Sequence, residues 1–394
     1  MTMRTADLFE PAELAEARRP AQQAAGAAGV LPSQAIEGLI STGAVQAVTP
    51  VQPGQIQPAS LDLRLGNVAY QVRSSFLPGR HTPVRAYLER LNVRTLDLSS
   101  RAVLQKGRVY IVPLQEALHL PPAIQARANP KSTTGRLDIL CRLLTEHGEA
   151  FDDVPPGYAG QLYAEIFPRT FAVYVRAGSR LNQMRFSTGQ TTSDREALTR
   201  EHAAEPVVLR ADGRPAARSI RGNSVFFSVA LADAGNGEFV GYRARQNRPL
   251  IDIDALEAYE PGDFWEPIRA RPSRSLVLEP NEFYILASRE FIRIPPSFAA
   301  EMVAYDPSLG EFRVHYAGFF DPGFGWGDAN KTGSRAVLEV RSHEVPFLLE
   351  DGQPVGRLVF EPLAERPDRT YGKPLGSYYN FQNVALGKQF RRPP

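Results

Sequence analysis

Cysteine and histidine are scarce in this sequence of 394 residues, which has one Cys and six His. The single cysteine, Cys141, excludes a disulfide within the chain, and no Cys-x-x-Cys pair is present for a cysteine-rich zinc site. Long apolar runs are also missing, since none approaches the ~20 residues that a transmembrane helix needs. The charged start of the chain lacks the continuous apolar stretch of a signal peptide. These absences predict a cytoplasmic protein with no membrane segment and no zinc.

Neither sign of charge is in excess. Lys and Arg number 45 against 43 Asp and Glu, which leaves a net charge of +2. This balance creates no strong field, so neither nucleic acid nor a membrane surface is an expected partner. Turn-forming residues are abundant instead, with 33 Pro and 31 Gly. Because they punctuate short runs of alternating apolar and polar residues, they favour a mainly β protein with few short helices.

The chain repeats itself at a fixed offset. "VLQKGRVYIVPLQEALHLPP", which starts at Val103, matches "VLEPNEFYILASREFIRIPP", which starts 174 positions later at Val277. The same offset aligns "LYAEIFPR" with "AVLEVRSH", and "AGSRLNQMRF" with "DGQPVGRLVF". Chance similarity would not keep one register over three separate blocks, so the sequence predicts an internal duplication.

The repeat divides the chain into two folded units. We expect a flexible arm at 1–30, a first domain at 31–186, a connector at 187–221 and a second domain at 222–394. In "SLDLRLG" apolar and polar residues alternate as they do in a strand. Frequent turn residues are typical of an antiparallel sandwich or barrel. A short helix is predicted in "PSQAIEGLISTGAV", with Ser33 as its N-cap and Gly43 as its stop.

"NPKSTTGRLD", from Asn129 to Asp138, is too polar for a core segment and carries groups that suit a polyphosphate. A glycine permits close backbone approach, hydroxyls donate hydrogen bonds, arginine offers a planar fork and lysine a point charge. The candidate phosphate-binding residues are Lys131, Ser132, Thr133, Thr134, Gly135 and Arg136. A solvated turn rich in hydroxyls is the alternative interpretation.

The surroundings of this turn resemble a known family. "QPASLDLRLG" precedes it, and a Pro-Gly-aromatic turn and a strand glutamate follow in both copies, as "PPGYAGQLYAE" and as "DPGFG" with "AVLE". With the closing "YGKPLGSYYNFQ", this set resembles the 2′-deoxycytidine 5′-triphosphate (dCTP) deaminase branch of the trimeric dUTPase-like superfamily, in its long duplicated form. The resemblance implies two tandem β-barrel domains of the dUTPase-like, jelly-roll type.

The same resemblance implies residue roles. Ser132 matches the family serine that helps to hold the attacking water, and Arg136 matches the arginine on the triphosphate and active site. Glu165 and Glu339 both match the catalytic glutamate. Asp321 matches the aspartate that contacts the sugar and base region.

The closing segment carries two further matches. Tyr371 and Gln382 match residues that contact the nucleotide. A family lysine in this segment has no clear match, because Tyr378 aligns there and Lys373 is only a nearby substitute.

The two copies differ at the phosphate turn. In the second copy the turn becomes "YDPSLG", and Asp306, which would repel a triphosphate, falls where Ser132 stands. The first copy, in turn, lacks a closing segment after Phe186. We therefore expect a complete site to take its phosphate turn from the first domain and its closing segment from the second.

The choice between Glu165 and Glu339 stays open at this point. Strand alternation places Tyr163 on the face of Glu165 and Val337 on that of Glu339, and both neighbours are assigned to substrate binding. Desolvation would raise the pKa of either carboxyl and suit it to proton transfer. Arg341, on the face of Glu339, would oppose this rise if the two paired, which slightly favours Glu165. In that case Glu165 would complete a site with Ser132 and Arg136 from another first-copy domain. Asp321 favours Glu339.

The expected reaction is the metal-free hydrolysis of dCTP to dUTP and ammonia. Mg²⁺ would accompany the triphosphate without catalysing deamination. The alternatives are a bifunctional dCTP deaminase and dUTP diphosphatase, a dUTPase, or a nucleotide-binding regulator without catalysis. By resemblance we expect a trimer of two-domain chains, with dTTP as a possible inhibitor.

Overall fold

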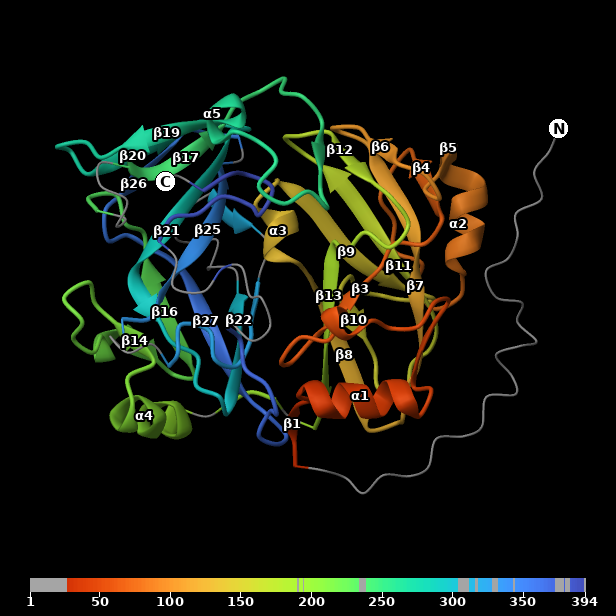
Figure 1. The fold of residues 1–394 in the computed structure, drawn as a ribbon, viewed down its shortest axis with the longest axis horizontal. Coiled ribbons are helices and arrows are strands. Elements are labelled where there is room, and N and C mark those ends of the chain that lie inside the picture. Colours follow the sequence, from red (N-terminus) through yellow and green to blue (C-terminus); the bar gives the residue numbers. More distant parts are fainter. Residues whose placement is uncertain are drawn as a thin grey trace.

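The computed structural model describes residues 27–189, 191–193, 195–233, 239–303, 312–315, 318–327, 332–342, 344–372, 379 and 383–392. Asp306, Lys373, Tyr378 and Gln382 lie outside these residues, as does most of the expected arm. Within the described part of the chain, no helix combines the length and the apolar composition needed to cross a bilayer. Strands dominate the structure (Figure 1), so the prediction of a mainly β protein is confirmed.

Two antiparallel sheets form the first half. The larger has the order β5 (Asn92–Asp97), β4 (Val68–Val72), β7 (Val109–His119), β11 (Ala159–Pro168) and β9 (Ile139–Thr145), with β2 (Val45–Ala47) also on β7. The other has the order β1 (Gly29–Val30), β13 (Asn182–Thr188), β8 (Ile124–Pro130) and β10 (Asp153–Val154), with β3 (Leu61–Leu63) on β13. Helix α2 (Val84–Leu91) packs against β4 and β5 through Val84 and Leu88.

The second half contains the same arrangement. One sheet has the order β19 (Trp265–Arg269), β17 (Phe239–Ala244), β21 (Phe283–Ile292), β25 (Ser334–Ser342) and β23 (Phe312–His315). The other has the order β15 (Ile220–Arg221), β16 (Ser224–Ser228), β27 (Pro354–Pro362), β22 (Phe298–Val303) and β24 (Phe319–Phe320). A short pair, β20 (Ser275–Leu278) and β26 (Phe347–Glu350), lies beside them.

Individual contacts also recur at the offset seen in the sequence. Ile111 pairs with Glu165 between β7 and β11, and Ile285 pairs with Glu339 between β21 and β25. The backbone N–H of Gln105 donates to the Tyr110 hydroxyl at 2.9 Å, and Glu279 N–H donates to the Tyr284 hydroxyl at 3.0 Å. Every member of the second set lies 174 positions after its counterpart.

Two local expectations need correction. Helix α1 (Ser33–Ser41) begins one residue earlier than predicted, so Pro32 is the N-cap and Ser33 is already helical. Gly43 follows the helix with φ 75°, a conformation that suits glycine. Within the expected connector, to which the sequence assigned no helix or strand, α4 (Arg195–Ala204) leads into β14 (Val208–Leu209), which pairs with β21 of the second half. Leu198 and Val208 are buried there, because apolar side chains punctuate this charged stretch.

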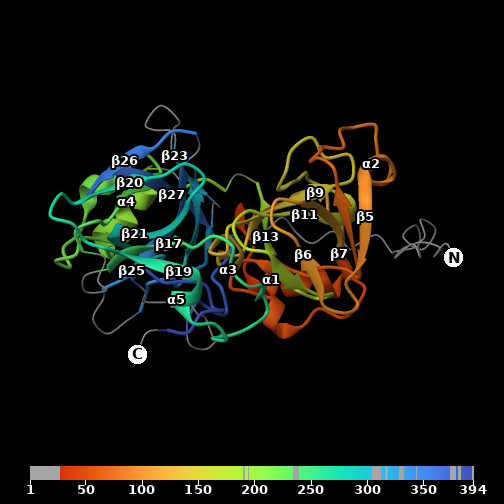
Figure 2. The same ribbon diagram turned by 90° about the horizontal axis from the view of Figure 1, so that it is seen from above.

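The two halves lie side by side and share an extensive boundary (Figure 2). Strand β18 (Ile251–Asp252) pairs in parallel with β12 (Val173–Val175), whose other neighbour is β6 (Ala102–Leu104). Phe171 meets the edge of Trp265 at a ring-centre distance of 5.5 Å. Arg185 of β13 donates to Glu361 of β27 at 2.9 Å. Buried apolar side chains of both halves thus form one continuous core.

Candidate active site

The phosphate turn forms one helical turn at the boundary between the halves. In α3 (Ser132–Gly135), the carbonyl of Lys131 accepts hydrogen bonds from Thr134 N–H at 2.8 Å and from Gly135 N–H at 3.0 Å. The Thr134 hydroxyl points into the protein and donates to the Leu181 carbonyl at 2.8 Å. Ser132 and Thr133 are half-buried. The turn therefore uses Thr134 to fix its position and keeps the Ser132 and Thr133 hydroxyls for contacts at its surface.

Glu339 of the second half packs directly against this turn. A Cβ on Gly135 would lie 2.6 Å from the carboxyl carbon of Glu339, which is closer than real Cβ atoms approach other atoms. Only glycine therefore allows the contact. Gly135 and Glu339 are 204 positions apart in the sequence, so their contact joins a residue of each half in one site.

The Glu339 carboxyl lies in a low-dielectric position, with 6 % of the residue exposed. Burial raises its pKa well above the usual range, the Arg136 charge opposes this rise, and the Asp138 charge adds to it. No hydrogen bond or ion pair to this carboxylate occurs among the described residues. The raised pKa favours the protonated form of this carboxyl, which suits a group that takes up and releases protons.

Asp321 is held close to the first half. It follows β24 and lies 3.8 Å from the guanidinium of Arg185. Burial raises the pKa of Asp321 to about 6, Arg185 lowers it, Asp62 raises it and Lys131 lowers it. Its Oδ1, the atom that lies near Arg185, accepts no hydrogen bond from the described residues and is a buried acceptor.

The turn after Asp321 supports Tyr371. Gly323 has φ 93°, and a side chain there would overlap Thr370 at 2.7 Å. The Tyr371 N–H donates to the Pro322 carbonyl at 2.7 Å, and its ring packs on Phe324 at a centre distance of 5.7 Å. Burial raises the pKa of the Tyr371 hydroxyl, and the Asp321 charge adds to this rise, while a hydrogen bond from the Tyr379 backbone and the Arg136 charge oppose it. The tyrosine therefore lies within the electrostatic reach of both Asp321 and Arg136.

Arg136 is fixed by the end of the chain. Its Nη1 donates to the carbonyls of Ala385 at 3.0 Å and Leu386 at 3.3 Å, and its guanidinium lies 3.8 Å from the centre of the Tyr379 ring. Residues near the end of the second half thus contact the turn of the first half. The Lys131 ammonium pairs with Asp62 at 2.5 Å.

Glu165 and Tyr163 lie away from this assembly, so within one chain they do not join the residues of the phosphate turn. Glu165 Oε1 accepts from Arg142 Nε at 3.1 Å and Nη2 at 2.5 Å. The Tyr163 hydroxyl donates to Glu146 at 2.5 Å. Both side chains therefore have partners within the first half: Arg142 forms an ion pair with Glu165, and the Glu146 carboxylate accepts the hydrogen bond of Tyr163. Val337 stays half-buried on the strand of Glu339.

Sequence reasoning missed several residues of the site. Arg185 lies 3.8 Å from the Asp321 carboxylate. The Arg185 guanidinium also lies 4.1 Å from the centre of the Phe319 ring, and this contact fixes the direction of the arginine side chain. Asp138 pairs with Arg341 across the boundary, and Thr170 donates to Asp138 at 2.6 Å. A usable signal was present only for Asp138, which ends the polar turn itself.

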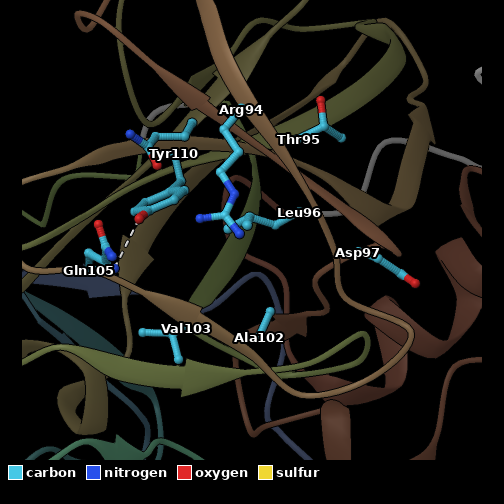
Figure 3. A pocket seen from close by; sticks show the side chains of 9 residues that line it. Arg94, Thr95, Leu96, Asp97, Ala102, Val103, Gln105 and Tyr110 are labelled. Carbon is cyan, nitrogen blue, oxygen red and sulfur yellow. Dashed lines mark hydrogen bonds between the residues drawn. The ribbon is translucent and has the colours of Figure 1, made fainter. Parts of the chain in front are cut away.

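A separate pocket of about 360 Å³ lies in the first half (Figure 3). The Arg94 guanidinium and the Tyr110 ring point into it, and Asp97 points away. The lining residues are Gln71, Arg94, Thr95, Leu96, Asp97, Ala102, Val103, Gln105 and Tyr110. None of them belongs to α3 or to the surroundings of Glu339, so the pocket is distinct from the candidate site.

Comparison with known proteins places this geometry in a family. A model of the 2′-deoxycytidine 5′-triphosphate deaminase N-terminal domain matches residues 27–190, and a model of the C-terminal domain matches residues 194–390. A crystal structure of 2′-deoxycytidine 5′-triphosphate deaminase from Agrobacterium tumefaciens is 49% identical, with a TM-score of 0.81. The match covers 86% of this chain and 99% of that chain.

Shorter relatives match part of the chain. The "dCTP deaminase, dUMP-forming" of Bifidobacterium longum (strain DJO10A) is 28% identical over 146 residues, 36% of this chain and 70% of that protein. The "dCTP deaminase" of Haloarcula marismortui is 30% identical over 146 residues, with the same two coverages of 36% and 70%. On these matches, the chain belongs to the 2′-deoxycytidine 5′-triphosphate deaminase family.

Proposed function

We propose that this enzyme hydrolyses dCTP to dUTP and ammonia at the boundary between its two halves. One observation carries the proposal: the buried carboxyl of Glu339 packs against Gly135 of the phosphate turn. A proton-transfer group from the second half thereby meets a triphosphate-binding turn from the first. Glu339 is accordingly the proposed proton shuttle, and Glu165 is a structural residue.

The reaction needs two proton transfers that one carboxyl can perform. Water adds to C4 of cytosine, and Glu339 takes a proton from that water and delivers it to N3. The proton of the new C4 hydroxyl then passes through Glu339 to the amino group. The C4–N bond breaks, ammonia leaves, and the C4 carbonyl of uracil remains. A carboxyl with a raised pKa suits both steps, because it can hold the proton between them.

The other site residues would bind and orient the nucleotide. Ser132 is proposed to hold the attacking water near the phosphates, with Thr133, Lys131 and Arg136 as further donors. The buried acceptor on Asp321 suits a hydroxyl of the sugar or an N–H of the base. Tyr371 and Gln382 stay proposed contacts of the closing segment, and Val337 a contact near the base.

Mg²⁺ is proposed as a companion of the triphosphate. Among the described residues, no group of three His, Cys, Asp or Glu side chains is placed to hold a metal ion. Phosphate oxygens would therefore supply ligands to the ion, which would neutralise phosphate charge beside Lys131 and Arg136.

The recurring strand pairs support two dUTPase-like barrels of the jelly-roll type that arose by duplication, with their junction in the region 187–221. We further propose a trimer of such chains in the cytoplasm, inhibited by dTTP. Light scattering tests the trimer, and a dimer would overturn it.

The decisive experiment is an ion-exchange time course of the full chain with dCTP and Mg²⁺. We expect equal amounts of dUTP and ammonia. Appearance of dUMP and pyrophosphate would instead assign the bifunctional reaction that the Bifidobacterium relative's name describes. Binding of dCTP without turnover would replace the proposal with a nucleotide-binding regulator.

A further inference from the structure

Two charged side chains beside the candidate site have no role in the reaction proposed above. Arg341 lies two positions after Glu339 on β25, and strand alternation puts both on one face. Its guanidinium does not pair with Glu339. It reaches across the boundary between the halves to Asp138, which lies 203 positions away in the sequence.

The contact is built rather than incidental. Arg341 and Asp138 are both buried, with 4% and 0% of their surfaces exposed. Thr170 binds both partners, since its hydroxyl donates to Asp138 at 2.6 Å and accepts from Arg341 at 3.0 Å. Arg341 also donates to the Asn281 carbonyl. The guanidinium is thus bound by Asp138, Thr170 and Asn281, and none of these hydrogen bonds goes to Glu339.

Asp138 holds its position through an unusual backbone. Its φ is 55°, in the left-handed region that Asp and Asn tolerate better than other residues with a side chain. Its N–H donates to the Gly135 carbonyl at 2.8 Å, and its carbonyl accepts from Arg169 N–H at 2.9 Å. The residue that binds Arg341 is thus attached to the end of α3.

We infer that Asp138 and Arg341 are positioning residues for the reaction: Asp138 binds the Arg341 guanidinium and keeps it from neutralising the Glu339 carboxylate. The inference rests on the proposed function, because it assigns a purpose to the surroundings of the proton shuttle. If Arg341 turned to Glu339, the carboxylate would gain an ion pair and become a weaker base.

The groups around Glu339 support this assignment. Arg136 and Asp138 approach from the first half, Arg341 stands along β25, and His315 and Ile285 are the register partners on β23 and β21. Arg136 is already held by the Ala385 and Leu386 carbonyls and by the Tyr379 ring. Arg136 is the cation whose charge acts on Glu339, and Arg341, two positions along the same strand, would become a second one if Asp138 released it.

The test compares the pH dependence of kcat in the wild type, in a single variant without the Asp138 charge and in a double variant that lacks the Arg341 charge as well. Asp138→Asn keeps the backbone conformation but releases Arg341. We expect the acidic limb of the kcat profile to move to lower pH, and kcat at neutral pH to fall by about tenfold, a fraction of the ~10²–10⁴-fold that general acid–base catalysis contributes. The double variant Asp138→Asn/Arg341→Met removes the cation as well, so its acidic limb should return towards that of the wild type.

A matched control separates this effect from weaker contact between the halves. Arg101 pairs with Asp252 of the second half at 2.6 Å and touches neither α3 nor Glu339. Arg101→Met should leave the kcat profile in place. An acidic limb that stays fixed in Asp138→Asn, or a double variant no closer to wild type than the single one, would overturn the inference. Absence of ammonia from the wild type would instead refute the proposed function.

Discussion

The strands β11 and β25 carry a glutamate at the same register position, yet the two carboxylates have different surroundings. Glu165 faces Arg142 on the neighbouring strand and is bound by it at 2.5 Å. Glu339 faces His315 in the same register, and its nearest arginine along the strand is bound elsewhere. The same position in the fold therefore does not give two carboxylates the same properties, because the charged side chain beside each carboxylate differs.

The same contrast explains why the two halves need each other. The first half supplies the turn with Gly135 and Arg136, and the second supplies Glu339, Asp321 and the closing segment. The first half's own glutamate has become part of its core, where Arg142 also lies over the Phe151 ring at 3.5 Å.

Replacement of each glutamate by glutamine should give the largest difference between the two halves. We expect Glu339→Gln to lose ~10²–10⁴-fold in kcat, the usual contribution of general acid–base catalysis. Glu165→Gln should keep kcat but unfold at lower temperature, because loss of one partner of a buried ion pair costs up to about 3–5 kcal/mol. Solvent reaches Arg142, whose side chain is 29% exposed, so the loss should lie below that range. Ammonia release and thermal unfolding measure the two effects.

The opposite pattern, an active Glu339→Gln beside a folded but inactive Glu165→Gln, would return the catalytic role to Glu165.

The contact between Gly135 and Glu339 should be the next most sensitive point. Gly135→Ala would force the carboxyl away from the turn, and displacement of a catalytic group by about 1 Å can cost ~10²-fold in rate. We expect kcat to fall by about that factor in steady-state assays. Gly38→Ala is the matched control, because nothing lies within 4 Å of its added carbon. In the middle of α1 this change should stabilise the protein by up to about 1 kcal/mol.

Sequence alone predicted the mainly β fold, and the repeat of the sequence reappears in the matching strand pairs. The complementary use of the two copies stays a prediction. Sequence reasoning could not choose between the glutamates, because the residues that decide lie far away in the sequence. Arg341 was expected to count against Glu339, and the structure reverses this, since Asp138 binds it from 203 positions away. The folded state of the connector was missed for a similar reason: β14 becomes a strand only by pairing with β21.

The pH dependence of stability should sharpen the comparison between wild type and Glu339→Gln. Burial raises the pKa of Glu339 in the folded state, while the unfolded chain keeps a value near ~4.3. The folded protein therefore binds a proton that the unfolded chain releases, and this contribution to stability is lost as pH rises through the folded-state pKa. Glutamine does not titrate.

In thermal melts, Glu339→Gln should gain stability relative to wild type as pH rises from 5 to 8. A difference that is constant over this range would show that Glu339 titrates as it does in the unfolded chain.

Lys388 should give the smallest effect, on binding rather than on chemistry. Burial lowers the pKa of its ammonium, Asp254 opposes this, and Lys131 lowers it further. The backbone N–H of Lys388 donates to the Tyr379 hydroxyl at 2.9 Å, so the residue is tied to the ring that lies on Arg136. Lys388→Met should therefore raise KM for dCTP by a few-fold, an effect of about 1 kcal/mol, and leave kcat unchanged.

Lys106, which binds the Gln246 side chain, is the matched control, and Lys106→Met should change neither constant. Equal KM values for Lys388→Met and wild type at low salt would show that Lys388 does not contribute to dCTP binding. Lys131 and Arg136 of the first half would then be the cations that bind the triphosphate.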